Sequence, residues 1–263
     1  MKLRGRRVLV TGGSRGIGAA IARGCATAGA DVAVMARSRD ELEKVAADIG
    51  GRAYATDLAD PSQVDGLIAR VEGDGPIDVL VNNAGIDEAG SFLDMSDGRI
   101  AHLLQVNLVA PMELCRQVIP GMVSRGGGHL VNVSSMAGTN SVPGLAAYSA
   151  SKSGLSHFTA LLRAEFKGLP VSTTLVEVGV IETGMADHVR TYGPSARAWR
   201  RLERLQLIPE IRPEKLAAAV VGAVEHGRRH VRLPRRDAMY PLLVEAPRRM
   251  TEWLLAGVDA QTK

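Results

Sequence analysis

The 263-residue sequence has few aromatic residues and no long uninterrupted apolar run. Phe, Tyr and Trp make up only 3% of the chain, whereas Ala, Val, Leu and Gly are plentiful, which suits close packing of helices on a sheet better than a β-sandwich. No apolar stretch approaches the roughly 18–20 residues that a membrane-spanning helix requires. The basic N-terminus carries no apolar signal segment, so the sequence predicts a cytoplasmic chain, with any membrane contact confined to its surface.

Cysteine is scarce, and neither the cysteines nor the histidines are spaced as metal ligands. Cys25 and Cys115 form no CxxC pair, and two isolated thiols are typical of a reducing compartment. We interpret them as small buried apolar residues. The six histidines include no HExxH or comparable spacing, so the sequence predicts no metal site.

The net positive charge is concentrated at the C-terminal end. The formal net charge is +4, and the stretch from His226 onward holds eight Arg and Lys against four Asp and Glu, which accounts for the whole excess. The basic cluster lacks interleaved aromatic residues, so binding of nucleic acid is not expected.

Short apolar runs alternate with helical patterns along the chain, which is typical of βαβ units and predicts a parallel sheet. Strands are expected over residues 7–11, 31–36, 52–55, 79–81, 129–133, 171–178 and 231–233. One long helix is expected over residues 100–125, with Pro111 as a point where it can bend, and another over 147–166. There is no linker or repeat, so residues 1–263 are predicted to form one doubly wound α/β domain of the Rossmann type, with helices on both faces and strand order 3-2-1-4-5-6-7.

A glycine-rich turn, TGGSRGIG, joins the first expected strand to the first helix. Glycine lets the backbone approach a pyrophosphate closely, and the helix N-terminus offers unpaired N–H groups and a partial positive charge. This context, between a strand and a helix, predicts a dinucleotide site. The residues expected to hold the dinucleotide here are Gly12, Ser14, Arg15, Gly16, Ile17 and Gly18.

The end of the second expected strand carries a basic residue at the point where an acidic residue would bind the 2′-hydroxyl of NAD. An Arg at this point accommodates the 2′-phosphate of NADP. No acid stands at residues 34–36, while Arg37 and Arg15 are both placed to bind a doubly charged phosphate. The pattern therefore predicts NADP(H), the alternative being that Arg37 is a solvated surface residue.

Tyr148 and Lys152 lie four residues apart on an expected helix and share one of its faces. A free phenol titrates near ~10, and a neighbouring ammonium group favours the phenolate. Tyr148 can then donate a proton to a carbonyl oxygen as hydride arrives, or accept one in the reverse direction. Ser135 ends the fifth expected strand, at the sheet edge where ligands bind, and its hydroxyl can hold the substrate oxygen.

The TGxxxGIG spacing, NNAG at residues 82–85 and YxxxK at residues 148–152 together resemble the short-chain dehydrogenase/reductase family over roughly residues 5–185. The resemblance implies that Ser135 is the catalytic serine with Ser134 as its structural neighbour, and that Asn107 positions a proton-relay water beside Lys152. It also implies further cofactor contacts, in addition to Tyr148 and Lys152 themselves, by Asp57, Leu58, Asn83, Ala84, Gly85, Ile181 and Thr183.

One segment departs from the family pattern. After the sixth strand the family usually has Pro-Gly, then an apolar residue and a Thr, whereas Val178 stands here in place of the proline. Proline would fix φ and stiffen the loop, so the exchange bears on the rigidity of the loop and on substrate preference, but not on the type of reaction.

These residues predict an NADP(H)-dependent enzyme that transfers a hydride between the nicotinamide and a carbonyl or secondary alcohol. Two alternatives stay open: a 3-oxoacyl thioester reductase acting on an acyl carrier or coenzyme A, and a non-catalytic NADP(H)-binding sensor. The sensor is disfavoured because Asn107, Ser135, Tyr148 and Lys152 are all present. The resemblance further implies a homodimer or homotetramer, assembled through helices that include the YxxxK helix.

Residues 184–212, the least regular sequence, are expected to form a flap over the substrate, and their apolar members favour a bulky hydrophobic substrate. The flap arginines could contact a phosphorylated acyl carrier, although a solvated face is the favoured interpretation; they are Arg190, Arg197, Arg200, Arg201 and Arg204. For the C-terminal extension, residues 234–263, packing on its own or a neighbouring subunit is favoured. The alternatives are lining the substrate pocket, or lying on an anionic membrane as a short basic amphipathic helix.

Overall fold

Seven parallel strands form one sheet in the order β3-β2-β1-β4-β5-β6-β7, as the sequence predicted. The computed structural model describes residues 1–140, 142–181, 192–204 and 209–234, to which this strand order refers. The strands are β1 (Arg7–Thr11), β2 (Asp31–Ala36), β3 (Arg52–Ala55), β4 (Val79–Asn82), β5 (Gly128–Ser135), β6 (Val171–Val178) and β7 (His230–Leu233). β5 extends beyond its expected range and pairs over its whole length with β6, so Ser135 lies opposite Val178.

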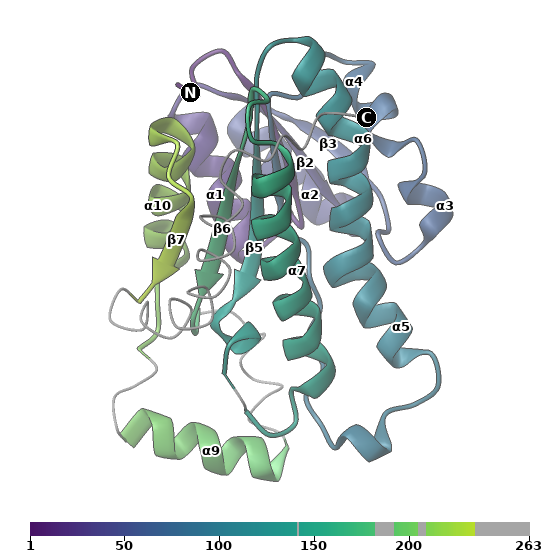
Figure 1. The fold of residues 1–263 in the computed structure, drawn as a ribbon, viewed down its shortest axis with the longest axis vertical. Coiled ribbons are helices and arrows are strands. Elements are labelled where there is room, and N and C mark those ends of the chain that lie inside the picture. The colour runs from purple at the N-terminus through teal and green to yellow at the C-terminus, as the bar shows by residue number, and fades with distance from the viewer. Residues whose placement is uncertain (141, 182–191, 205–208, 235–263) are drawn as a thin grey trace.

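Helices cover both faces of the sheet (Figure 1). One face is covered by α1 (Gly16–Thr27), α2 (Arg39–Ile49) and α10 (Pro213–His226). The other is covered by α3 (Pro61–Val64), α4 (Leu67–Glu72), α6 (Ala110–Ser124) and α7 (Ala146–Glu165). Within β1, Val8 and Val10 belong to the first apolar core and Leu9 to the second, because successive strand residues point to opposite faces.

The long helix expected over residues 100–125 is wrong as a continuous α-helix. α5 (Arg99–Leu104) passes into a π-helical turn (Gln105–Val109), labelled η2, before α6 begins at Ala110. Pro111 falls in the first turn of α6, directly after the π-turn. The π-turn buries Asn107 completely, at the inner face of the helix.

Two short 3₁₀ turns, η1 (Phe92–Asp94) and η3 (Met136–Gly138), and one more helix lie near the carboxyl ends of the strands. The helix, α9 (Gly193–Arg204), forms inside the segment that had the least regular sequence, and it lies beyond the end of the sheet toward which the strand arrows point (Figure 1). Among the described helices, none is both long enough and apolar enough to cross a membrane.

The N-terminus of the chain contacts the end of α10. The Met1 ammonium group donates to the Glu225 carbonyl oxygen (3.3 Å), and the Leu3 N–H donates to the Glu225 carboxylate (3.4 Å). Gly24 of α1 faces α10, since a Cβ there would be in ordinary contact with Ala217, 3.5 Å away. α10 therefore covers the N-terminal part of the chain.

Candidate active site

The glycine-rich turn lies between β1 and α1 at the carboxyl end of the sheet. Gly12 and Gly16 have φ of +65° and +56°, the left-handed region that glycine adopts without strain. A Cβ on Gly18 would lie 2.1 Å from the Gly12 carbonyl oxygen, so no side chain fits there. Ser14 and Ile17 are half-buried within the turn. No side chain caps α1 and its first turn has no acid, so its N–H groups are suited to a phosphate.

The end of β4 is hydrogen-bonded to this turn. The Thr11 hydroxyl oxygen accepts from the N–H groups of Asn83 and Ala84, each at 3.0 Å. The Asn83 side-chain amide donates to the Thr11 carbonyl oxygen, also at 3.0 Å. The NNAG turn thus fixes the glycine-rich turn from the neighbouring strand, at the point where the strand order reverses and ligands bind in such sheets.

Arg15 and Arg37 lie at the ends of adjacent elements. Arg15 is the N-cap residue of α1 and Arg37 directly follows β2; both side chains are exposed. The two segments are joined where the Gly13 N–H donates to the Met35 carbonyl oxygen (3.1 Å). In the part of the chain that the structure describes, neither guanidinium group forms an ion pair, so both can bind an anionic ligand.

The other residues expected to contact the cofactor lie along the same edge of the sheet. Asp57 follows β3, and its carboxylate accepts from the Ala59 N–H (3.0 Å); Leu58 is buried. Ile181 is buried and forms a parallel bridge with Ile211. Thr183 lies outside the described residues.

Tyr148 and Lys152 share one face of α7, as predicted. The Lys152 ammonium nitrogen lies 5.9 Å from the centre of the Tyr148 ring. Lys152 is buried, and its Nζ donates to the Val133 carbonyl oxygen (3.1 Å). Ser135, at the end of β5, accepts from the Ala137 N–H (3.1 Å), which orients its hydroxyl group. The structure therefore brings Ser135, Tyr148 and Lys152 to one place.

The pKa values of this pair do not shift in the direction that the sequence suggested. Burial raises the pKa of Tyr148 to about 12, a hydrogen bond with the Ser135 side chain opposes the rise, and the charge of Asp87 adds to it. Burial lowers the pKa of Lys152 to about 8. The expectation of a lowered phenol pKa is thus wrong for this arrangement, because loss of hydration outweighs the hydrogen bond with Ser135.

Asn107 links the π-turn to the segment after β4. Its side-chain amide donates to the Ile86 carbonyl oxygen (2.8 Å) and accepts from the Ile86 N–H (2.8 Å), and it also donates to the Ser151 hydroxyl (3.1 Å). A Cβ on Gly85 would lie 3.3 Å from both Asn107 Oδ1 and Lys152 Nζ. Gly85 thus leaves room for Asn107 and Lys152 to lie close to the same backbone segment.

Sequence reasoning missed two residues of this site. Ser151 connects Asn107 to α7, since its hydroxyl group also donates to the Tyr148 carbonyl oxygen (2.6 Å). Asp87 places a negative charge near the phenol. Ser151 lies within the YxxxK motif, which was a usable signal, whereas nothing in the sequence around Asp87 indicated its role. Ser134 donates to the Lys152 carbonyl oxygen (2.9 Å) and so supports α7.

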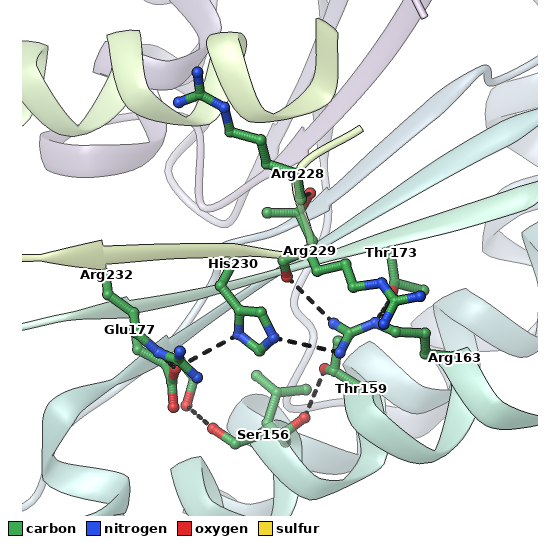
Figure 2. Close-up of polar contacts among 12 residues, drawn as sticks. Ser156, Thr159, Arg163, Thr173, Glu177, Arg228, Arg229, His230 and Arg232 are labelled. Atoms are coloured by element: carbon green, nitrogen blue, oxygen red, sulfur yellow. Dashed lines mark hydrogen bonds and ion pairs between the residues drawn. The ribbon is translucent and has the colours of Figure 1, made fainter. Parts of the chain in front are cut away.

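A polar cluster holds β6 and β7 together next to this site (Figure 2). Glu177 is buried, and its carboxylate accepts from Arg232 Nε at 2.7 Å and lies 3.9 Å from His230 Nδ1. Arg163 of α7 reaches the same cluster, with Nη1 3.4 Å from His230 Nε2 and Nη2 donating to the Arg229 carbonyl oxygen (3.2 Å).

The loop that lacks the usual proline begins directly after Glu177. The Ser135 hydroxyl group donates to the Val178 carbonyl oxygen (3.4 Å), and the Gly179 N–H donates to the Leu233 carbonyl oxygen (2.8 Å). Pairing of β5, β6 and β7 therefore restrains the backbone at Val178, where a proline ring would otherwise restrict φ.

Neither cysteine takes part in the site. Cys25 and Cys115 are buried free thiols, and burial raises the pKa of each to about 12. Over the described ranges, no three side chains of His, Cys, Asp or Glu gather in a way that would hold a metal ion.

Comparison with known proteins places these features in a family context. The family model for short chain dehydrogenases matches residues 6–192. The ketoacyl reductase HetN of Nostoc sp. PCC 7120 is 37% identical over 231 residues, which cover 85% of this chain and 77% of HetN.

Two solved structures are similar over most of the chain. A 3-oxoacyl (acyl-carrier-protein) reductase from Agrobacterium tumefaciens C58 with NADP bound is 29% identical, with a TM-score of 0.77 over 88% of this chain and 93% of its own. A short-chain oxidoreductase of metagenomic origin in complex with NADP is 32% identical, with a TM-score of 0.72 over 89% of this chain and 98% of its own.

Proposed function

The chain belongs to the short-chain dehydrogenase family, and on that basis we propose that it is an NADP(H)-dependent oxidoreductase that interconverts a carbonyl and a secondary alcohol. The observation that carries the proposal is the placement of Tyr148, Lys152 and Ser135 together at the carboxyl edge of the sheet, beside a glycine-rich turn. NADP-bound structural relatives support the choice of cofactor.

The residues around the glycine-rich turn fit a dinucleotide phosphate. The uncapped α1 N-terminus receives the pyrophosphate, and Arg15 and Arg37 bind the 2′-phosphate. When bound, NADP(H) supplies or accepts the hydride. The other proposed contacts are Gly12, Ser14, Gly16, Ile17, Gly18, Asp57, Leu58, Asn83, Ala84, Gly85, Tyr148, Lys152, Ile181 and Thr183.

Residues of the chain transfer the proton and bind the carbonyl oxygen of the substrate. Tyr148 donates its phenolic proton to the carbonyl oxygen, and Ser135 donates a hydrogen bond to the same oxygen. With its pKa raised to about 12, the phenol of Tyr148 is protonated at neutral pH, as a general acid for carbonyl reduction has to be. Lys152 supplies positive charge beside it, and Asn107 orders the adjoining segment and anchors a relay water.

An apolar cover beside the site supports a bulky hydrophobic substrate. Trp199 of α9 and Leu145 are buried together, with Val142 and Val180 packed against them. The names of HetN and of the Agrobacterium reductase favour a second candidate within the same reaction type, reduction of a 3-oxoacyl thioester.

We also propose that residues 1–263 form one domain and that the chain assembles as a homodimer or homotetramer. Val109, Met112 and Leu161, on the π-turn, α6 and α7, are 41%, 39% and 48% exposed, and such exposed apolar side chains support packing against a second copy. The C-terminal extension, residues 234–263, lies outside the described residues except for Pro234. Its contact with a subunit, the pocket or a membrane surface stays a prediction, as does a cytoplasmic location.

Replacing Tyr148 with Phe tests the reaction. We expect the Tyr148→Phe variant to lose turnover by at least about 100-fold, since a general acid contributes about 10²–10⁴-fold, while NADPH still binds. The measurement is NADPH consumption over a panel of ketones, aldehydes and 3-oxoacyl thioesters, with NADPH fluorescence titration for binding. Wild-type protein that binds NADPH but reduces nothing on the panel would favour the sensor alternative, and a Tyr148→Phe variant with full turnover would exclude the proposed role.

A further inference from the structure

Four arginines lie along one face of α9. Arg197, Arg200, Arg201 and Arg204 are spaced three and four residues apart, so their side chains project from the same side of the helix, and all four are exposed. From first to last they span about 10 Å at 1.5 Å per residue. We call these four residues the arginine face of α9.

The opposite side of α9 is packed against the rim of the proposed active site. Trp199 is buried against Leu145, which lies three residues before Tyr148 on the chain. The Ser195 hydroxyl group, also buried, donates to the Pro143 carbonyl oxygen. The buried side therefore fixes α9 next to the site, and the arginine face points away from the protein.

The arginine face has no acidic counterpart among the described residues. α9 contains one acid, the exposed Glu203, whose carboxylate accepts from Trp199 Nε1 (2.8 Å). The four arginine side chains border a hollow of about 450 Å³. Four cationic groups around one open hollow, on a helix fixed at the rim of the site, attract an anion with several charges.

We propose that the arginine face binds the phosphate groups of a coenzyme A thioester whose acyl group occupies the proposed active site. The inference rests on the proposed function, because it identifies the carrier end of the substrate. Arg binds phosphate through paired N–H donors, and coenzyme A carries a diphosphate and a 3′-phosphate within a length that matches the arginine face. Its flexible pantetheine arm then leads from this outer surface toward the site.

The geometry favours this small ligand over a membrane surface. An amphipathic helix that lies on a bilayer buries its large apolar side chains in the lipid, but Trp199 of α9 is already buried against Leu145. A hollow bordered by four arginine side chains also suits several phosphates close together better than it suits the broad face of an acidic carrier protein.

The test compares two substrates that differ only in the carrier: acetoacetyl-coenzyme A and the acetoacetyl thioester of N-acetylcysteamine, which has no phosphate. We expect the triple variant R200A/R201A/R204A to raise KM for the coenzyme A ester about tenfold, with kcat little changed, since several exposed charge contacts of modest strength are lost. KM for the phosphate-free ester stays at the wild-type value. Free coenzyme A should inhibit the wild-type reaction competitively and inhibit the variant much less.

The control variant Arg23→Ala removes an exposed arginine of α1 that pairs with Asp48, and it should change neither KM. Equal KM values for the two esters in wild-type protein, with no effect of the triple variant, would overturn the inference and leave the proposed function standing. If simple ketones are reduced but neither thioester is, the inference is also overturned while the proposed function stands. If no carbonyl compound is reduced while NADPH binds, the proposed function itself fails.

Two further results would assign the arginine face to a different partner and so overturn the coenzyme A assignment. In the first, the triple variant loses binding to phosphatidylglycerol vesicles while its KM for the coenzyme A ester is unchanged. In the second, only the ester carried on an acyl carrier protein responds to the variant. Circular dichroism of the triple variant, with the unchanged KM for the phosphate-free ester, establishes that its fold is intact.

Discussion

Lys152 brings a positive charge into a buried part of the molecule, where its Nζ donates to the Val133 carbonyl oxygen. Burial lowers its pKa from 10.5 to about 8. Below pH 8 the residue is protonated in both states, and the unfolded chain holds the proton more tightly, so the folded state is destabilised by about 3 kcal/mol. This cost diminishes as the pH rises from 8 to 10.5.

We therefore expect the Lys152→Met variant, which keeps the length of the side chain without the charge, to be more stable than the wild type at pH 7. The free energy of unfolding should rise by about 1–3 kcal/mol while turnover is lost. Urea denaturation at pH 7 and at pH 10 measures the effect, and the difference should shrink at the higher pH. A variant less stable than the wild type at pH 7 would contradict the assignment of a destabilising charge.

Arg37 sets the preference for NADP(H) in the proposed site. Arg37→Glu should raise the Kd for NADPH by at least about tenfold, because an attractive contact to the 2′-phosphate becomes a repulsive one, and should leave the Kd for NADH nearly unchanged. Fluorescence titration with each cofactor measures both values. Arg39→Glu is the matched control, since Arg39 is exposed two residues further along and faces Glu43 instead. An equal loss for both cofactors would count against 2′-phosphate binding by Arg37.

At the level of secondary-structure elements, the end of β6 depends on a buried ion pair with β7. Removing one partner of a buried pair leaves the other charge without compensation, so Glu177→Ala should lower the free energy of unfolding by about 3–5 kcal/mol. Asp48→Ala, which breaks the exposed pair with Arg23, should cost less than about 1 kcal/mol. Denaturant melts of the two variants compare the effects, and equal losses would mean that the Glu177 cluster contributes no more than a surface pair.

Most strands were predictable because they are short apolar runs buried in the sheet, although β3 is largely exposed, and the spacing of NNAG and YxxxK indicated most of the candidate site. The interruption of the long helix was not predictable, because the turn around Asn107 is fixed by bonds to Ile86 and Ser151, which are distant in sequence. α9 was missed because its many arginines leave few apolar positions to reveal a helical period. The pKa shifts at Tyr148 and Lys152 follow from burial, which no local spacing encodes.

The whole molecule should lose stability at acidic pH because of His129. The ring is buried on β5, with Nε2 2.8 Å from the Thr174 hydroxyl and Nδ1 2.7 Å from the Ser172 hydroxyl, and burial lowers its pKa to about 4. The unfolded chain takes up this proton near pH 6.5, so the folded state loses about 3 kcal/mol as the pH falls from 6.5 to 4.

The test is the slope of unfolding free energy against pH for the wild type and the His129→Gln variant. Over pH 6.5 to 4 the variant should be flatter, because it has no proton to take up at this position, whereas above pH 7 the two slopes should coincide. Equal slopes over the acidic range would mean that His129 is not the group responsible.

The contact of α1 and the N-terminus with α10 has a consequence for synthesis of the protein. β1 pairs with β4 some 70 residues later, and the outer side of α1 is covered only when residues 213–226 have been made. A chain still attached to the ribosome therefore exposes the apolar side of α1 until nearly all of it has emerged. Nascent chains that stop before Pro213 should be retained by chaperones, and a reading frame cut short there should yield aggregates instead of a smaller enzyme.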